Sequence, residues 1–260
     1  MHLKATIKKK CPLFVLDVSI EVSEKDYVIL LGPSGAGKST ILKIIAGVEK
    51  AEYQKIELNG KEITHLPPEK RRIVYLPQTN SLFPHLSVKE NLIFSFKARK
   101  KSINYELLNQ IVENFNIEHL LNRYPSNLSE GEAQRVALAR AICAESEILL
   151  LDEPLSSLDF HLKIELIKFL KNFPQNYRIS IIHVTHDLLE ALLLANNVYI
   201  LTHGKITYSG NINNFFKDLN NLNNFTSKKD PVLSSFENLN NLNFLQIIAN
   251  FTQMMEKNKV

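Results

Sequence analysis

The stretch GPSGAGKST, Gly32 to Thr40, decides the fold class of this sequence. It follows the apolar run Tyr27–Leu31, a predicted buried strand, and it opens a segment with helical spacing. Glycines let backbone amides point inward at phosphate groups, and a helix N-terminus adds positive potential. A glycine-rich turn without a ligand is the alternative, but the complete motif in this context disfavours it. The stretch therefore predicts a triphosphate site, with Lys38 reaching the phosphates and the Ser39 hydroxyl binding Mg²⁺.

Short apolar runs recur along the rest of the chain. Apolar runs of this length suit strands that are buried on both faces, as in a parallel sheet. Besides the first, they are Ile73–Leu76, Ile148–Asp152, Ile179–Val184 and Val198–Leu201, and helical segments lie between them. This alternation predicts an α/β core. Further strands are expected at Leu3–Lys8, Phe14–Val22 and Lys55–Leu58, the last of which ends at a tight Asn59-Gly60 turn.

Two regions depart from the alternation of strands and helices. Residues 80–128 read as mostly helical between two core strands, so we expect an inserted helical subdomain over about residues 80–145. From residue 211 the chain is Asn-rich, and KDLNNLNNF (217–225) is echoed by ENLNNLNFL (237–245). A low-complexity tail and a pair of short amphipathic helices are both compatible with it. We therefore expect one domain over residues 1–210 and a tail over residues 211–260.

Composition and charge exclude several classes of protein. The net charge of +4 is only mildly basic, the basic runs are short, and no aromatic-rich basic module accompanies them, so no nucleic-acid partner is expected. Cys11 and Cys143 lie far apart without a CxxC motif, which fits a reducing compartment. The N-terminus lacks an apolar signal core, and the apolar runs are too short to span a bilayer. Any membrane role is thus expected to come through a partner.

The stretch ILLLDEP, Ile148 to Pro154, predicts the second half of the site. Asp152 is placed to hold Mg²⁺ through water, and Glu153 to polarise a water for attack on the γ-phosphate. Acids at a strand end can merely cap the next element, but the phosphate loop upstream disfavours that reading. His186 follows another predicted strand, at the edge of the sheet where ligands bind. A zinc pair with His183 is conceivable, but no second ligand pair accompanies it.

The stretch LSEGEAQRVALARA, Leu128 to Ala141, admits two interpretations. Ser129 and Glu132 have the spacing of a helix capping box, which would make this an ordinary helix start. The same exposed amides could bind a phosphate. The cap and an anion site are therefore compatible.

In this order, GPSGAGKST, YLPQ, LSEGEAQRVALARA, ILLLDEP, SSLD and VTHD resemble the motifs of the ATP-binding cassette (ABC) ATPases. The resemblance covers about residues 3–210. It implies an α/β P-loop NTPase fold of ABC type: a mainly parallel core sheet flanked by helices, an N-terminal antiparallel β subdomain and an inserted helical subdomain. It also implies ATP as substrate and Mg²⁺ as its metal.

The resemblance further implies a role for each matching residue. The residues that contact nucleotide in one chain are Phe14, Gly32, Pro33, Ser34, Gly35, Ala36, Gly37, Lys38, Ser39 and Thr40. The metal ligands are Ser39, Gln78 and Asp152, and the catalytic residues are Glu153, His186 and Gln78. Phe14 would stack on adenine, although a buried strand phenylalanine is the alternative.

The resemblance also implies that the site is shared between two copies. Ser129 and Gly131 would contact the γ-phosphate of ATP held by a second copy, and Asp159 would lie across the same interface. The chain departs from the usual Leu-Ser-Gly-Gly-Gln here, because Glu130 replaces the first glycine and Glu132 the glutamine. Glu130 would place a negative charge near a triphosphate. Because the second glycine is retained, we expect activity to be kept.

LPPEKRRIVYLPQTNSLFPHLSVKENL, Leu66 to Leu92, resembles the ATPases of bacterial and archaeal importers. IIHVTHDLLEA and PLFVLDVSIEV look most like molybdate/tungstate importer ATPases, and sulfate, polyamine, iron and sugar importers share much of the pattern. This implies a peripheral homodimer on the cytoplasmic face of the membrane, which binds an integral membrane permease and, indirectly, a solute-binding protein. No C-terminal β-barrel regulatory domain is expected. A soluble non-transport ABC ATPase and a non-hydrolysing adaptor are the alternatives.

Overall fold

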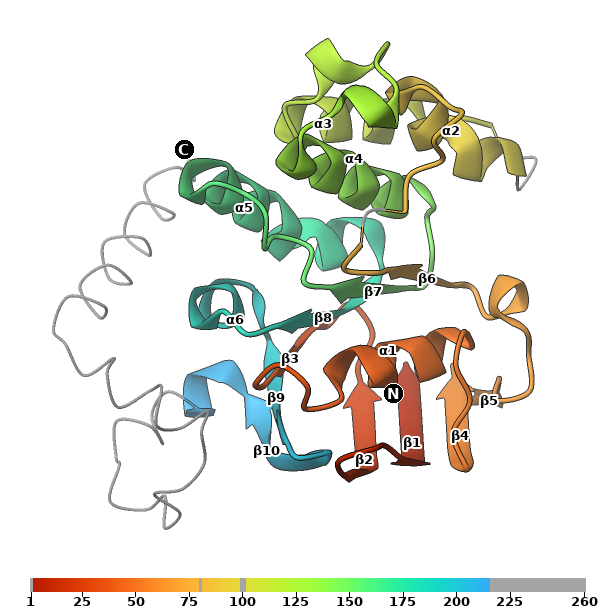
Figure 1. Cartoon of the computed structure of the whole chain (residues 1–260), viewed down its shortest axis with the longest axis vertical. Helices are drawn as coiled ribbons and strands as arrows, with labels where there is room; N and C mark the ends of the chain where they lie inside the picture. Colours follow the sequence, from red (N-terminus) through yellow and green to blue (C-terminus); the bar gives the residue numbers. More distant parts are fainter. Residues whose placement is uncertain (1, 80, 99–101, 216–260) are drawn as a thin grey trace, which may run out of the picture. The chain divides into compact units, whose positions relative to one another are not determined.

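The computed structural model describes residues 2–79, 81–98 and 102–215. In these ranges ten strands form one sheet in the order β5-β4-β1-β2-β10-β9-β3-β8-β7-β6 (Figure 1). The strands are β1 Leu3–Lys10, β2 Val15–Val22, β3 Tyr27–Leu31, β4 Tyr53–Leu58, β5 Lys61–Glu62, β6 Ile73–Leu76, β7 Ile148–Asp152, β8 Ser180–Thr185, β9 Asn197–Thr202 and β10 Lys205–Asn211. The α-helices are α1 Lys38–Ala46, α2 Val88–Ala98, α3 Tyr105–Asn114, α4 Glu130–Cys143, α5 Phe160–Tyr177 and α6 Leu188–Leu194.

The sheet has a parallel part and an antiparallel part. Strands β6, β7, β8, β3 and β9 run parallel, and β3, β7 and β8 are buried along their whole length. Strands β2, β1, β4 and β5 pair antiparallel at the other end of the sheet. The two parts confirm the predicted fold class, a mainly parallel core with an N-terminal antiparallel region. Continuous burial explains why the parallel strands read as unbroken apolar runs.

The antiparallel part packs against α1. Strand β2 alternates exposed and buried residues, and its inward side chains join the apolar face of α1 in one core cluster. Asn59 and Gly60 have φ angles of 51° and 74°, which form the two-residue turn between β4 and β5. The expectation that a strand begins at Phe14 is wrong by one residue. Cys11 N–H donates to the Phe14 carbonyl at 2.9 Å, so Phe14 closes a turn before β2 begins.

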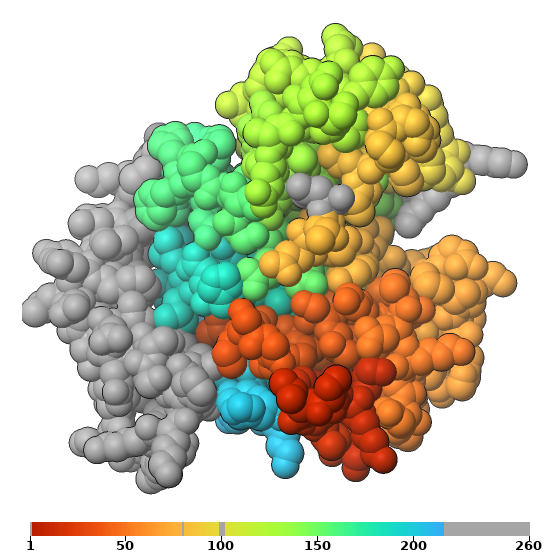
Figure 2. Space-filling view, in the orientation of Figure 1, coloured from red at the N-terminus to blue at the C-terminus, as the bar shows by residue number. Residues whose placement is uncertain are grey.

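Helices α2, α3 and α4 occupy the interval between β6 and β7, and in Figure 2 they form the yellow-green region of the surface. Helix α4 is buried on more than one side, because it packs against α2 and α3 and also against β6. Its Arg135 donates to the carbonyls of Phe115 and Asn116 at 2.9 Å each and thereby fastens α4 to the segment after α3. Helix α4 thus joins the helices of the insert to one another and to the core sheet.

The described part of the chain ends at Phe215, shortly after β10. The two amphipathic helices considered for residues 217–225 and 237–245 lie outside the described residues, as does nearly all of the expected Asn-rich tail. In the described ranges, no helix has the length and apolar character that a membrane span requires.

Candidate functional site

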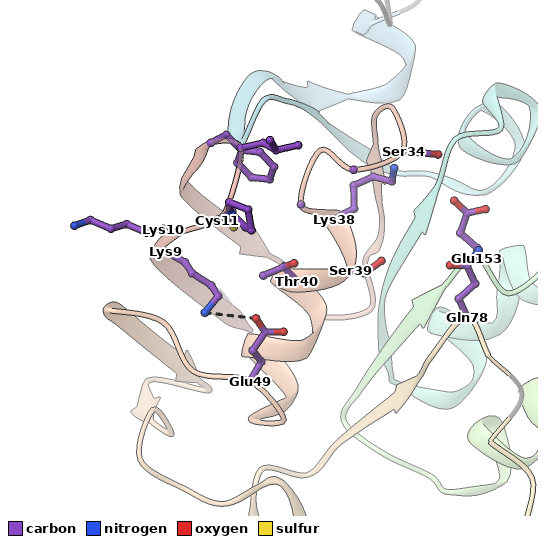
Figure 3. Close-up of a pocket in the computed structure, with 15 residues that line it drawn as sticks. Lys9, Lys10, Cys11, Ser34, Lys38, Ser39, Thr40, Glu49, Gln78 and Glu153 are labelled. Atoms are coloured by element: carbon purple, nitrogen blue, oxygen red, sulfur yellow. Dashed lines mark ion pairs between the residues drawn. The ribbon is translucent and has the colours of Figure 1, made fainter.

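A cavity of about 460 Å³ opens beside the loop between β3 and α1 (Figure 3). It brings together these residues predicted for the site: Phe14, Ser34, Gly35, Gly37, Lys38, Ser39, Thr40, Gln78 and Glu153. Lys9, Lys10, Cys11, Pro12, Leu13 and Glu49 complete its lining. In Figure 3, Gln78 and Glu153 lie opposite Lys38 and Ser39, which belong to the first turn of α1. Segments distant in sequence therefore share one hollow.

The loop has the backbone geometry of a phosphate cradle. Gly37 precedes α1 with φ 105°, a left-handed conformation that favours glycine. At Gly32 a Cβ atom would lie 2.3 Å from the carbonyl oxygen of Leu201, so only glycine fits there. The amides of this loop and of the first turn of α1 form an anion-binding concavity. The backbone can therefore turn tightly in this loop because glycine occupies positions 32 and 37.

Lys38 is almost completely buried in the first turn of α1, and its side chain folds back along the loop. Its Nζ donates to the carbonyl oxygens of Gly32 at 2.6 Å and Pro33 at 2.9 Å. Burial lowers the pKa of Lys38, and the nearby carboxylates of Glu153 and Asp152 act in the opposite direction. The ammonium group is thus held within the loop by acceptors that phosphate oxygens can replace.

Asp152 is buried at the end of β7, and each of its oxygens accepts a hydrogen bond. Ser39 Oγ donates to Oδ1 at 2.8 Å, and the Tyr75 hydroxyl donates to Oδ2 at 3.1 Å. Burial raises the pKa of Asp152, while these two hydrogen bonds lower it. Burial and the adjacent Asp152 also raise the pKa of Tyr75, so its hydroxyl stays a donor. A hydroxyl and a carboxylate at this distance are hard oxygen ligands that fit Mg²⁺, which binds few protein groups and keeps substrate phosphates and waters.

Glu153 adopts a strained backbone conformation at the sheet edge. Its φ is 51°, which is uncommon for a residue with a side chain. Its N–H donates to the Val184 carbonyl at 2.9 Å, and its own carbonyl accepts from Gln134 Nε2 at 3.0 Å. The carboxylate lies 3.0 Å from His186 Nδ1. The two backbone hydrogen bonds hold Glu153 in this unusual conformation, and its side chain lines the cavity.

Gln78 and Phe14 both line the cavity. Gln78 follows β6, is exposed, and shares the lining with Glu153. Phe14 is half-buried beside the loop, and a Cβ at Gly37 would lie 3.2 Å from its ring. The aromatic ring is therefore held against the phosphate loop on one side and lines the cavity on the other.

Ser129, Gly131 and Asp159 do not line this cavity. Ser129 caps α4: its side chain accepts from Glu132 N–H at 3.3 Å, and the Glu132 carboxylate accepts from Ser129 N–H at 2.7 Å. The capping box predicted from the sequence is thereby confirmed. A Cβ at Gly131 would lie 3.1 Å from the Ser157 carbonyl oxygen, and Asp159 caps α5. One chain alone therefore leaves these three residues outside its cavity.

Three further residues were not singled out from the sequence. Tyr75 holds Asp152, and a tyrosine within a core strand is itself a signal, because its hydroxyl needs a partner. Gln134 holds the Glu153–Ser157 segment, for its Oε1 also accepts from Ser157 N–H at 2.8 Å. Ser157 Oγ in turn donates to the Glu130 carboxylate at 2.7 Å. Such contacts depend on how α4 lies against the loop, and no local pattern shows that.

His183, by contrast, is buried in the core. Its Nδ1 lies 2.9 Å from the Tyr27 hydroxyl, and its Nε2 lies 3.1 Å from the Glu190 carboxylate. Lys163 pairs with that carboxylate at 2.6 Å, and together the neighbours hold the pKa of Glu190 down to about 2 despite its burial. His183 thus belongs to a buried polar network.

A family model described as ABC transporter matches residues 15–156. Over 220 residues the chain is 42% identical to the molybdate/tungstate import ATP-binding protein WtpC of Archaeoglobus fulgidus, which covers 85% of this chain and 91% of that protein. It is also 42% identical over 203 residues to WtpC of Pyrococcus horikoshii, covering 77% and 59%. The maltose/maltodextrin import ATP-binding protein MalK of Yersinia pestis is 39% identical over 196 residues, with coverage of 75% and 53%.

Solved structures match as well. One, the ATP-binding subunit of an ABC transporter, has a TM-score of 0.75 at 26% identity and covers 85% of this chain and 94% of its own. Another is a dimeric ATP-binding cassette in a post-hydrolysis state bound to ADP and phosphate, with a TM-score of 0.70, 26% identity and coverage of 81% and 98%. The chain spans nearly all of the Archaeoglobus relative but less than two thirds of the Pyrococcus and Yersinia proteins.

Proposed function

Because this chain belongs to the ABC transporter family, we propose that it is the ATP-hydrolysing subunit that powers solute import through a separate membrane permease. One observation carries the proposal. The phosphate loop, Ser39 and Glu153 line a single cavity, and behind them Asp152 bonds to Ser39 and His186 to Glu153. Together they supply a triphosphate cradle, a metal position and a base for water.

Each side chain has a task in the proposed reaction. Loop amides and Lys38 bind the β- and γ-phosphates, with Phe14 at the adenine. Ser39, Gln78 and Asp152 would hold Mg²⁺, which when bound neutralises phosphate charge. Glu153 accepts a proton from the water whose oxygen attacks the γ-phosphorus. The bond from the γ-phosphorus to the oxygen bridging the β- and γ-phosphates breaks, and ADP keeps that oxygen.

His186 and residues of a second copy complete the site. His186 Nδ1 lies beside the Glu153 carboxylate, and its ring is exposed at the sheet edge, so it can contact the γ-phosphate as well. Ser129 and Gly131 would reach the γ-phosphate from a second copy, with Asp159 in the same interface. This assignment accounts for their position outside the cavity of their own chain. The protein would then work as an ATP-dependent homodimer on the cytoplasmic face of the membrane.

The permease would dock on an apolar surface of the helical insert. Phe83 packs against Phe94 in a tilted arrangement with a centroid distance of 4.4 Å, and the Arg140 guanidinium lies 4.8 Å from the Phe83 ring centre. These residues border a second cavity of about 280 Å³ between the insert and β6. Phe94 is 39% exposed. An exposed Phe94 and a half-buried Phe83 beside a hollow suit a helix supplied by a partner.

Phe83→Asp should therefore abolish copurification with the permease and spare ATP hydrolysis by the isolated protein. Docking would be weakened because the new carboxylate would be buried against Phe94 beneath the permease helix. Hydrolysis would be spared because Phe83 does not line the nucleotide cavity. Tyr105→Asp is the matched control, because Tyr105 is an exposed aromatic on α3 of the same insert. Thermal unfolding of both variants separates the two readings: a large loss of stability confined to Phe83→Asp would mean that Phe83 is core rather than a docking residue.

We further propose that the imported solute is molybdate or tungstate. The support is the similarity to the two WtpC proteins and the motifs IIHVTHD and PLFVLDVSIEV. Deletion of the gene should reduce uptake of molybdate or tungstate, and the wild-type chain should restore uptake where Glu153→Gln does not. Unchanged uptake of molybdate, tungstate and sulfate would refute the solute but leave the ATPase proposal standing.

A further inference from the structure

Tyr75 makes a contact to the metal position that the proposed mechanism does not use. It lies in β6, where its partner across the parallel ladder is Leu150 of β7. The ring is half-buried and packs against the main core cluster, and the hydroxyl donates to Asp152 Oδ2 at 3.1 Å. The other oxygen of the same carboxylate, Oδ1, accepts from Ser39. Asp152 is 3% exposed, so its orientation depends on these two partners.

We propose that Tyr75 is a positioning residue for the Mg²⁺ site: its hydroxyl fixes Oδ2 of Asp152, so that Oδ1 faces Ser39 and the metal. The inference rests on the proposed function. The carboxylate of an aspartate can rotate about its Cβ–Cγ bond. If one oxygen of a buried carboxylate lacks a hydrogen-bond donor, the folded state loses free energy of stabilisation. The hydrogen bond from the Tyr75 hydroxyl restricts this rotation and satisfies Oδ2. Strand β6 then serves the site twice, through Tyr75 and through Gln78 just beyond its end.

A purely structural role makes a different prediction from a positioning role. Phenylalanine fills nearly the same volume as tyrosine, so Tyr75→Phe keeps the packing of the ring and removes only the hydrogen bond. If the hydroxyl supports only the general structure of the site, its loss would weaken ATP binding equally with and without metal, or not at all. Loss of carboxylate orientation would weaken only the part of binding that depends on metal. The metal dependence of ATP affinity therefore separates the two roles.

The experiment measures ATP binding to the full chain by calorimetry, in EDTA and across a Mg²⁺ series, and Mn²⁺ binding to the ATP complex by electron paramagnetic resonance. For Tyr75→Phe we expect the affinity in EDTA to stay within about twofold of wild type. The half-saturating Mg²⁺ and Mn²⁺ concentrations should rise roughly three- to tenfold, as expected for loss of one intramolecular hydrogen bond of ordinary strength. Tyr199→Phe is the matched control, because Tyr199 also borders the core cluster and its hydroxyl bonds the Glu21 backbone instead.

Two results would overturn the inference. One is a metal response of Tyr75→Phe that equals those of wild type and Tyr199→Phe. The other is an equal loss of affinity with and without metal, which would mean that the Tyr75 hydroxyl supports the nucleotide site in general and not the orientation of Asp152 toward the metal. A wild-type chain that does not hydrolyse ATP in the presence of Mg²⁺ would contradict the proposed function itself, and that result is visible before any variant is made.

Discussion

Glu153→Gln should lose nearly all ATP hydrolysis while it still binds Mg-ATP. The amide has almost the same shape as the carboxylate, but it cannot accept the proton of the attacking water, and such a general base contributes about 10²- to 10⁴-fold. The strained backbone at Glu153 is fixed by bonds of its own N–H and carbonyl, which the substitution leaves in place. With ATP the variant should also accumulate as a dimer, because products never form to release the interface.

Steady-state phosphate release and gel filtration with ATP check this expectation. Glu165→Gln is a suitable control, since Glu165 is a half-exposed glutamate of α5 that pairs with His161. Its turnover should equal that of wild type. Near-normal hydrolysis by Glu153→Gln would remove Glu153 from the role of base and leave the attacking water without an assigned proton acceptor.

Ser129→Arg should block turnover and leave nucleotide binding by the single chain intact. Ser129 lies outside the cavity of its own chain, whereas Lys38 and the phosphate loop lie within it. The long arginine would obstruct the surface that meets the γ-phosphate held by a second copy. Hydrolysis by the wild-type chain should for the same reason rise faster than linearly with protein concentration below the dimer dissociation constant.

Ser129→Asp separates a phosphate contact from a mere helix cap. Aspartate caps a helix as well as serine does, so α4 should remain folded. Its charge would meet the γ-phosphate, and hydrolysis should fall by about tenfold or more. Ser87→Asp is the matched control, because Ser87 forms the same capping box with Glu90 at the start of α2. Full stability together with full activity of Ser129→Asp would decide for the cap alone.

The sequence predicted the parallel core closely, because burial on both faces leaves a clear local signal. The bounds of β3, β6 and β7 coincide with the apolar runs from which they were expected. Strand ends set by turns were less certain: β1 extends to Lys10, and the turn that Phe14 closes moves the start of β2.

Some residues of the site could be predicted from local sequence, whereas others depend on tertiary contacts. Motif spacing was enough to expect Lys38, Ser39 and Glu153 around one cavity, because a strand–loop–helix unit and a strand end fix them locally. The bond from Tyr75 to Asp152 depends on the register between β6 and β7, which no short pattern encodes. Glu130, which replaces the usual glycine, was considered from the sequence only as a charge near the triphosphate. In the structure its carboxylate accepts a hydrogen bond from Ser157, in the loop before Asp159 of its own chain. Only the tertiary arrangement reveals such a pairing.

The central claim is that each catalytic site is built from two copies, and mixing two inactive variants tests it most directly. Lys38→Met removes the phosphate lysine, and Ser129→Arg blocks the opposite half of the site. In a mixed dimer the intact phosphate loop of one copy faces the intact Ser129 of the other. Equal mixtures should therefore recover about one quarter of wild-type ATPase activity, since half of the dimers are mixed and each has one of two sites intact. Folded variants that stay inactive when mixed, at concentrations where the wild type dimerises, would contradict the account.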